Sequence, residues 1–232
     1  MLDLKEKLIV ALDVDTLEKA QNFVDLLLPK VKFFKVGSQL FTACGPEAVK
    51  MIGEKGAKVF LDLKFHDIPN TVYSAVASGT SRGAVFMMTL HTLGGLEMLK
   101  AAVKGASDKA AELKIKKPYL IGVTVLTSES LDVATPEKVL ERARLAKDSG
   151  LDGVVCAVSE AAMIRKEFGK KFIIVTPGIR PEKSSPDDQK RTSTASDAIK
   201  AGSDFLVVGR PILEAKDPLK MIENIAIAAG AV

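Results

Sequence analysis

Four ionisable side chains lie close together at the end of one apolar segment: Asp62, Lys64, His66 and Asp67, in the run Phe60-Leu-Asp-Leu-Lys-Phe-His-Asp-Ile-Pro-Asn-Thr71. Side chains alternate along a strand, so Asp62 and Lys64 should share one face of it. Pro69 cannot continue a central strand, so we expect the strand to end near Phe65 and Asp67 to lie on the next loop. Carboxylates and ammonium groups gathered at a strand end indicate a catalytic cluster.

A structural ion pair at a sheet edge is the simpler interpretation of Asp62 and Lys64 taken alone. The whole cluster favours function, because neighbouring carboxylates repel one another by roughly 4 kcal/mol at an effective dielectric of about 20. Interleaved cations would offset this cost, and charges held in this way cluster at functional sites. Both histidines, His66 and His91, are interpreted as structural, since His66 points away from Asp67 in an extended chain.

The elements that position this cluster are predicted from hydrophobic patterning. Apolar runs indicate strands at residues 8–12, 33–36, 57–63, 84–90, 119–125, 153–157, 172–175 and 205–208. Apolar residues three and four apart indicate helices at residues 17–28, 46–55, 96–111, 136–149 and 159–168. Continuous apolar runs are typical of strands covered on both faces, as in a parallel sheet.

Eight such units in 232 residues predict one domain over residues 1–232. The predicted fold is α/β, a (β/α)8 TIM barrel in which a parallel eight-stranded barrel is ringed by helices. An open doubly wound sheet is the alternative, although no glycine fingerprint for a dinucleotide follows the first strand.

The site of such a barrel lies at the carboxyl ends of its strands. The candidate residues there are Asp13, Lys35, Asp62, Lys64, Asp67, Thr127, Ser128, Pro177, Arg180, Gly209 and Arg210. Barrels of this class often bind phosphate after strands seven and eight, where Arg210 would fork onto its oxygens and Pro211 would begin a helix. A solvated arginine in a turn is the alternative. Residues 176–192 contain three prolines and should form a long strand-free loop that binds ligand or closes as a lid.

Composition excludes several classes of function. The net charge of +4 is spread over the chain and aromatic residues make up only 5%, which argues against nucleic-acid binding. The distant Cys44 and Cys156 suggest neither a zinc site nor a disulfide framework, and no apolar run reaches membrane-spanning length. No signal peptide is expected, so a cytoplasmic location follows. No metal is expected either, because Lys35 and Lys64 would take the space and charge of a cation near the carboxylates.

The motifs taken together closely resemble bacterial orotidine 5′-phosphate decarboxylases, over nearly the whole chain. The segments that carry the resemblance are Leu8-Ile-Val-Ala-Leu-Asp-Val-Asp15, Phe34-Lys-Val-Gly37, Asp62-Leu-Lys-Phe-His-Asp-Ile-Pro-Asn-Thr71, Gly122-Val-Thr-Val-Leu-Thr-Ser128, Thr176-Pro-Gly-Ile-Arg-Pro181, Asp187-Asp-Gln-Lys-Arg191 and Val208-Gly-Arg-Pro211. The resemblance implies conversion of orotidine 5′-monophosphate to UMP and CO2, the last step of pyrimidine nucleotide synthesis, without a cofactor.

Catalytic roles follow from the resemblance residue by residue. Lys64 would be the general acid that stabilises and protonates a vinyl carbanion at carbon six, and Asp62 would lie beside the departing carboxyl group. Lys35 and Asp67 would complete an alternating Lys-Asp-Lys-Asp network. Asp67 and Thr71 would reach into the site of a neighbouring subunit, which implies a homodimer.

Substrate contacts follow in the same way. Asp13 and Lys35 would hold the ribose hydroxyls, and Thr127 or Ser128 the pyrimidine edge. The phosphate end of the site would comprise Pro177, Arg180, Gln189, Gly209 and Arg210, under a lid at residues 181–191. The sequence departs from the family pattern in the segment 89–95, which is expected to lie off the charged network and to affect only local packing.

Two other functions remain open. Sugar-phosphate decarboxylases and hexulose-phosphate synthases share the Asp-x-Lys-x-x-Asp pattern and use magnesium, but resemble one another in a glutamate on strand two, where this chain has Lys35. A non-catalytic barrel that binds a phosphorylated metabolite through Gly209 and Arg210 is the second alternative. Such a binder would gain nothing from the cost of assembling the charged cluster.

Overall fold

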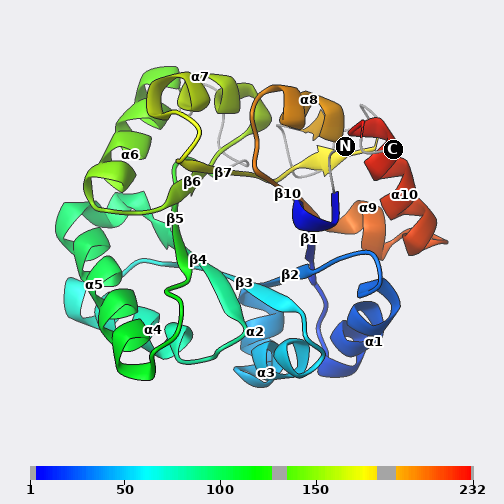
Figure 1. The fold of residues 1–232 in the computed structure, drawn as a ribbon, viewed down its shortest axis with the longest axis horizontal. Coiled ribbons are helices and arrows are strands. Elements are labelled where there is room, and N and C mark those ends of the chain that lie inside the picture. The colour runs from blue at the N-terminus through cyan, green and yellow to red at the C-terminus, as the bar shows by residue number, and fades with distance from the viewer. Residues whose placement is uncertain (1–3, 127–134, 182–191, 231–232) are drawn as a thin grey trace.

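Eight parallel strands close into a barrel that is ringed by helices (Figure 1). The computed structural model describes residues 4–126, 135–181 and 192–230. The barrel strands are β1 (Leu8–Ala11), β2 (Phe33–Gly37), β3 (Lys58–Phe65), β4 (Val85–His91), β5 (Tyr119–Val123), β6 (Gly153–Val155), β7 (Ile173–Thr176) and β10 (Phe205–Val208). Each lies close to its expected bounds, and β1 closes the ring by pairing with both β2 and β10. The predicted fold class is confirmed.

The helices follow the strands in the β-then-α order. Those predicted from periodicity are α1 (Leu17–Leu27), α3 (Glu47–Glu54), α5 (Gly95–Leu113), α6 (Pro136–Asp148) and α7 (Val158–Phe168). α9 (Arg210–Leu213) was predicted from Pro211 and not from periodicity. Those not predicted are η1 (Leu4–Glu6), α2 (Ser38–Cys44), α4 (Pro69–Thr80), η2 (Thr92–Gly94), α8 (Ala195–Lys200) and α10 (Pro218–Ala228). Side-chain caps begin several of them: the Thr16 and Thr135 hydroxyls and the Asp217 carboxylate accept hydrogen bonds from backbone amides.

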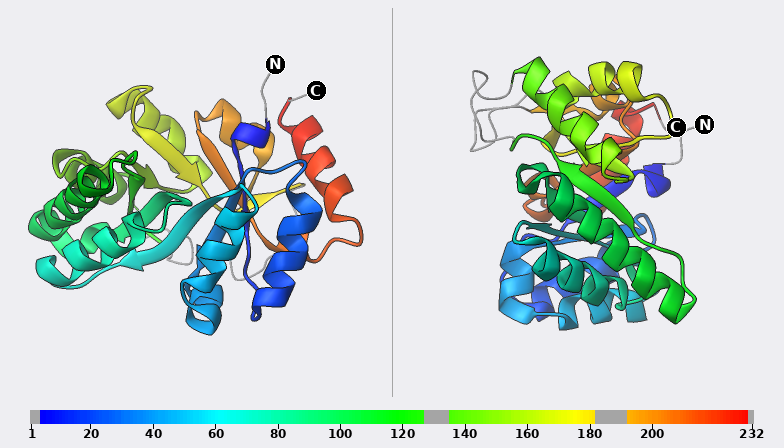
Figure 2. Two further views of the ribbon diagram at one scale, coloured as in Figure 1. Left: turned by 60° about the horizontal axis from the view of Figure 1, so that its bottom comes forward. Right: turned by 90° about the vertical axis from the view of Figure 1, so that its left-hand side faces the viewer.

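The barrel is buried on both sides, which explains its continuous apolar runs. On β1, Ile9 and Ala11 belong to the cluster inside the barrel, whereas Leu8 and Val10 belong to the larger cluster between the strands and the helices. The helical ring closes where α10 packs beside α1 (Figure 2). Within the three described ranges, no helix has the length and hydropathy needed to cross a bilayer.

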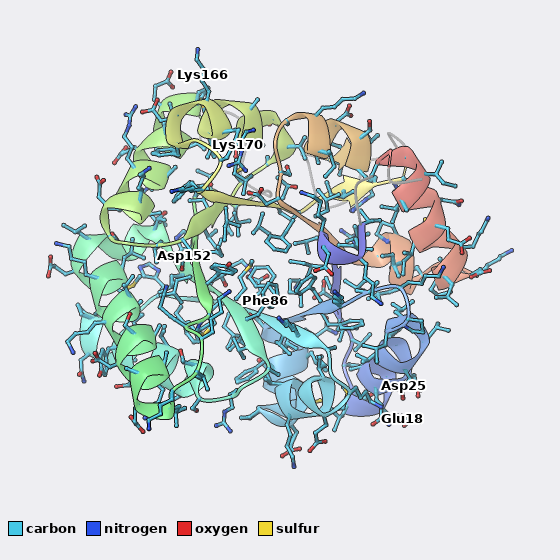
Figure 3. The ribbon with its side chains drawn as sticks, viewed as in Figure 1. Glu18, Asp25, Phe86, Asp152, Lys166 and Lys170 are labelled. Atoms are coloured by element: carbon cyan, nitrogen blue, oxygen red, sulfur yellow. The ribbon has the colours of Figure 1, made fainter. Side chains whose placement is uncertain are left out.

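Aromatic side chains fill the barrel at the amino ends of its strands. The ring of Phe33 lies 4.5 Å from that of Phe86 and 5.7 Å from that of Phe205, between centroids. Figure 3 shows Phe86 inside the ring of strands, whereas Asp25 and Lys166 lie among the outer helices. This layer fills the amino end of the barrel with apolar side chains.

One expectation about the loop after the seventh strand was wrong. Residues 176–192 are not strand-free, because Thr176 ends β7 and β8 (Ile179–Arg180) pairs in parallel with β9 (Ser193–Thr194). A two-residue strand is too short to produce an alternating pattern, and its partner is distant in sequence. The expected lid lies mostly at residues 182–191, outside the described residues.

Candidate active site

A cavity of about 520 Å³ opens at the carboxyl ends of the strands, on the side predicted for the site. Its charged lining comprises Asp13, Lys35, Asp62, Lys64, Arg180, Arg210 and Glu214. Its apolar lining comes from strand residues and their extensions: Ala11, Phe60, Val123, Val125, Leu126, Val155, Val175 and Val207. A cavity of this volume, with an apolar wall and a few charged groups, suits a small organic anion.

Four charged side chains form an alternating row across the cavity. The ammonium nitrogen of Lys35 lies 3.0 Å from Asp13 Oδ1 and 3.6 Å from Asp62 Oδ2. The Lys64 ammonium donates a hydrogen bond of 3.0 Å to Asp62 Oδ1. The side chains of Lys35 and Asp62 are only 12% and 13% exposed, so water screens this part of the row poorly. Each carboxylate in the row therefore lies next to a cation.

Asp62 stays ionised in this setting. Burial alone would raise the pKa of its carboxyl, but the charges of Lys35 and Lys64 and the hydrogen bonds from Lys64 and Thr89 outweigh burial. The pKa of Asp62 therefore lies below its usual value. A fixed negative charge is held at the floor of the cavity.

Lys64 projects from an irregular strand end. The register pairs Leu61 with Met88 and then Phe65 with Leu90, so β3 bulges relative to β4. Lys64 lies in this bulge with a φ of 49°, a left-handed conformation that is uncommon for a residue with a side chain. Such backbone conformations are concentrated at functional sites.

Thr89 on β4 contacts both charged residues of the bulge. Its hydroxyl accepts a hydrogen bond of 2.9 Å from the Lys64 amide and donates one of 2.9 Å to Asp62 Oδ1. The expectation that segment 89–95 lies off the charged network is therefore wrong at its first residue. The register shift between β3 and β4 brings Thr89 to this position.

Two arginines line the opposite end of the cavity. Arg180 on β8 is buried, and its guanidinium also donates to the Ile179 carbonyl at 3.1 Å. Arg210 begins α9 directly after Gly209, and Pro211 stands in the first turn of that helix, as predicted. Pro177 and Gly209 line the cavity beside the arginines. Guanidinium groups bind phosphate through paired, charge-assisted hydrogen bonds, so this pair suits the phosphate end of a ligand.

Comparison with known proteins bears on the kind of chemistry. A sequence model of the family described as "Orotidine 5′-phosphate decarboxylase / HUMPS family" matches residues 6–225. The chain belongs to this family. It is 44% identical over 235 residues to an orotidine 5′-phosphate decarboxylase of Geobacter sp. (strain M21), with 97% of both chains covered. It is 46% identical over 235 residues to the one of Aliivibrio fischeri (strain MJ11), with 98% of both covered.

A solved structure of the family has the same fold. The orotidine 5′-phosphate decarboxylase of Lactobacillus acidophilus superposes with a TM-score of 0.84 at 38% sequence identity, covering 97% of this chain and 100% of that one. The family and the enzyme class, a carboxy-lyase, were predicted from the motifs, and both predictions are confirmed.

Some residues that the family resemblance singled out lie away from the cavity of their own chain. Asp67 is exposed on the loop after β3, where its carboxylate accepts a hydrogen bond of 2.6 Å from the Ile68 amide. Thr71 is exposed in the first turn of α4. Neither is among the residues that line the cavity. Thr127, Ser128 and Gln189 lie outside the described residues.

Other residues of the site were not singled out from the sequence. Gln39 on α2 and Glu214 after α9 line the cavity. Gly37 lies so close to Lys35 that a β-carbon there would be 2.7 Å from the Lys35 ammonium nitrogen. Gln39 lies two residues after the motif that contains Lys35, which is the one local signal for it. Thr89 reaches the charged row because of the register between β3 and β4. Gly37 matters because the flexible Lys35 side chain ends beside it.

Proposed function

We propose that this protein decarboxylates orotidine 5′-monophosphate to UMP and CO2 without a cofactor. The observation that carries the proposal is the alternating row Asp13, Lys35, Asp62 and Lys64 in a cavity that also has an apolar wall and two arginines. Family membership and the names of the relatives support the same reaction. The row offers both a cation for a developing negative charge and a proton donor.

Lys64 is the proposed catalytic acid. Cleavage of the bond between carbon six and the carboxyl group leaves the electron pair on a ring carbon that has no good resonance sink. A cation already in place stabilises that charge without having to reorganise in the transition state. The Lys64 ammonium then gives its proton to carbon six, forming the new C–H bond, and the amine regains a proton from solvent.

Asp62 acts beside the departing carboxyl group in this proposal. Its lowered pKa keeps it negative at neutral pH. The charge holds the Lys64 ammonium in place through their hydrogen bond. It also disfavours the substrate carboxylate but not the neutral CO2 that leaves. Lys35 lies between Asp13 and Asp62 and compensates both of them.

The rest of the nucleotide is assigned to the other groups of the cavity. Asp13 and Lys35 would bind the ribose hydroxyls, and Thr127 or Ser128 the pyrimidine edge. The phosphate would lie with Pro177, Arg180, Gln189, Gly209 and Arg210, of which all but Gln189 are described and line the cavity. Binding energy from this distant group would help to hold the reacting carbon against Lys64.

A homodimer is part of the proposal. Asp67 and Thr71 are exposed and lie away from their own cavity, as expected for residues that complete the site of a partner. Exposed apolar side chains follow the neighbouring strands β3 and β4: Ile68 is 66% exposed and Leu93 54%. The rings of His66 and His91 stack with their centroids 5.5 Å apart, which links the end of β3 to the end of β4. A partner subunit that receives Asp67 and Thr71 would cover these apolar side chains.

The magnesium-dependent relatives are disfavoured by the contacts of the row. Lys35 stands on β2, where those relatives have a glutamate. Its ammonium lies between the Asp13 and Asp62 carboxylates, which a magnesium ion would need as ligands. Among the described residues, no group of three or more His, Cys, Asp or Glu side chains is arranged to hold a metal ion.

The experiment that tests the proposal is product analysis. Purified protein is incubated with orotidine 5′-monophosphate in excess chelator, and UMP and CO2 are quantified. Equal amounts of both products are expected. Turnover that requires added magnesium, or turnover of a hexulose phosphate instead, would contradict the proposed reaction.

Two further parts of the proposal are that residues 1–232 form one catalytic domain and that the protein acts in the cytoplasm.

A further inference from the structure

We propose that Thr89 is a positioning residue, whose hydroxyl fixes the Asp62 carboxylate and the Lys64 backbone relative to each other. The inference rests on the proposed function, in which these two residues act on the substrate. Thr89 does not line the cavity, so its effect on the reaction is exerted through its two partners.

The contacts form a closed triangle. Thr89 Oγ1 is 2.9 Å from the Lys64 amide nitrogen and 2.9 Å from Asp62 Oδ1. The same carboxylate oxygen accepts from the Lys64 ammonium at 3.0 Å. Thr89 itself has no exposed surface. Because the triangle is buried at one corner, water cannot readily replace the hydroxyl.

The chemistry of the partners fixes the direction of both hydrogen bonds. A backbone amide only donates, and an ionised carboxylate only accepts. A hydroxyl can accept from the first and donate to the second at the same time, whereas an apolar side chain of the same shape can do neither. Thr89 therefore supplies the bulged Lys64 amide with an acceptor that the strand ladder lacks at this point.

The consequence for catalysis lies in the geometry of the strand end. Without the hydroxyl, the left-handed backbone at Lys64 loses a hydrogen bond that stabilises it, and the Asp62 carboxylate is free to rotate about its side-chain bonds. Both changes move the ammonium relative to the position of carbon six. Small displacements of a catalytic group are costly to rate even where substrate binding is unaffected.

A threonine that merely satisfies a buried bulge is the alternative, and it predicts lower stability with no specific effect on turnover. Three variants separate the two. Thr89→Val keeps the shape and removes the hydroxyl, and Thr89→Ser restores the hydroxyl. Thr80→Val is the matched control, since Thr80 is equally buried but its hydroxyl donates to the Val76 carbonyl within α4. If Thr89→Val does not fold, Thr89→Ala takes its place.

We expect Thr89→Val to lower kcat by about 10- to 100-fold, the range for losing a hydrogen bond to a charged group, while KM changes little. Thr89→Ser should recover most of kcat, and Thr80→Val should match the wild type. The proposal is overturned if Thr89→Val turns over at the wild-type rate, if Thr89→Ser does not recover, or if Thr80→Val loses as much.

A second readout does not depend on turnover. The pKa of the Asp62 carboxyl is measured by NMR titration of the free protein. Thr89→Val should raise it, because a hydrogen bond to the ionised form is lost, and Thr89→Ser should not. An unchanged pKa in Thr89→Val overturns the positioning role. Failure of the wild type to decarboxylate the nucleotide, with the pKa shift present, would overturn only the proposed function.

Discussion

Lys64 and Asp62 form an ion pair of 3.0 Å at the point where β3 leaves its regular path. One residue separates them, and in a regular strand side chains at this spacing stand side by side at about 7 Å. The left-handed backbone at Lys64 changes the course of the chain there. The pair lies in the cavity wall, with Asp62 largely buried and Lys64 37% exposed. The ammonium is thus anchored at the carboxylate and still accessible to a ligand.

Gly37→Ala should displace the Lys35 ammonium without unfolding the protein. The backbone of Gly37 is extended, with a φ of −95°, so alanine is tolerated there, but its β-carbon would lie 2.7 Å from Lys35 Nζ. The flexible lysine must then move away from Asp13 and Asp62. We expect kcat/KM to fall by about 10- to 100-fold with little change in thermal unfolding. Unchanged kinetics would show that the contact has no catalytic consequence.

Arg210→Ala should act through the phosphate. Because a guanidinium–phosphate hydrogen bond is charge-assisted, its loss should lower kcat/KM for orotidine 5′-monophosphate by about 10- to 100-fold. Turnover of orotidine, which lacks the phosphate, should change far less. Arg144→Ala is the control, since Arg144 is exposed and pairs with Glu167 at 2.8 Å on the outer helices. Equal losses on both substrates would contradict a role in phosphate binding.

Mixing two inactive variants tests whether Asp67 serves the partner's site. Lys64→Ala and Asp67→Ala homodimers should each be inactive. A mixed dimer has one site with an intact Lys64 and an intact Asp67 from its partner. Random exchange should therefore restore about one quarter of the wild-type activity. If Asp67 serves the site of its own chain, no mixed dimer contains an intact site, and mixing restores nothing.

The lowered pKa of Asp62 should make stability depend on pH at the acid end. The unfolded carboxyl, with a pKa of about 3.9, binds a proton more readily than the folded one. The stabilising contribution is present above that value and is lost as the pH falls through the lower folded pKa. Urea unfolding at about pH 6 and about pH 3 should show the stability difference between wild type and Asp62→Asn shrinking at low pH.

The control for this measurement is Asp148→Asn, which removes an exposed carboxyl on α6. Its stability should follow that of the wild type at both pH values. A difference between wild type and Asp62→Asn that is equal at both pH values would contradict the assignment of a lowered pKa to Asp62.

The sequence was sufficient for the barrel because burial on both sides of each strand produces continuous apolar runs. Helices with a strong apolar stripe, such as α1 and α6, were found from the same patterning. α4 was missed because it begins with Pro-Asn-Thr and its buried face is made of small and β-branched residues. α2 and α8 are only 7 and 6 residues long, too short for a reliable period. α10 does have an apolar stripe, which includes the buried Ile222 and Ile225, and it was not predicted.

The candidate site was predictable where its residues cluster in sequence and not where they meet across strands. Asp62 and Lys64 stand two residues apart, so the pattern indicated them directly. Thr89 reaches them only because the register between β3 and β4 shifts, and local sequence does not encode that shift. The importance of Gly37 depends on where the flexible Lys35 side chain ends, which is settled by its carboxylate partners in space.

The most direct test of Lys64 as the catalytic acid is the loss of orotidine 5′-monophosphate ultraviolet absorbance in excess chelator, with wild type and Lys64→Ala measured side by side. Lys19→Ala serves as the control, since Lys19 is exposed and pairs with Asp15 at 2.8 Å on the outside of the barrel. We predict rapid loss for wild type and Lys19→Ala, and a rate lower by more than about 1,000-fold for Lys64→Ala. Comparable rates in wild type and Lys64→Ala, or turnover that appears only when magnesium is restored, would contradict metal-free decarboxylation with Lys64 as the acid.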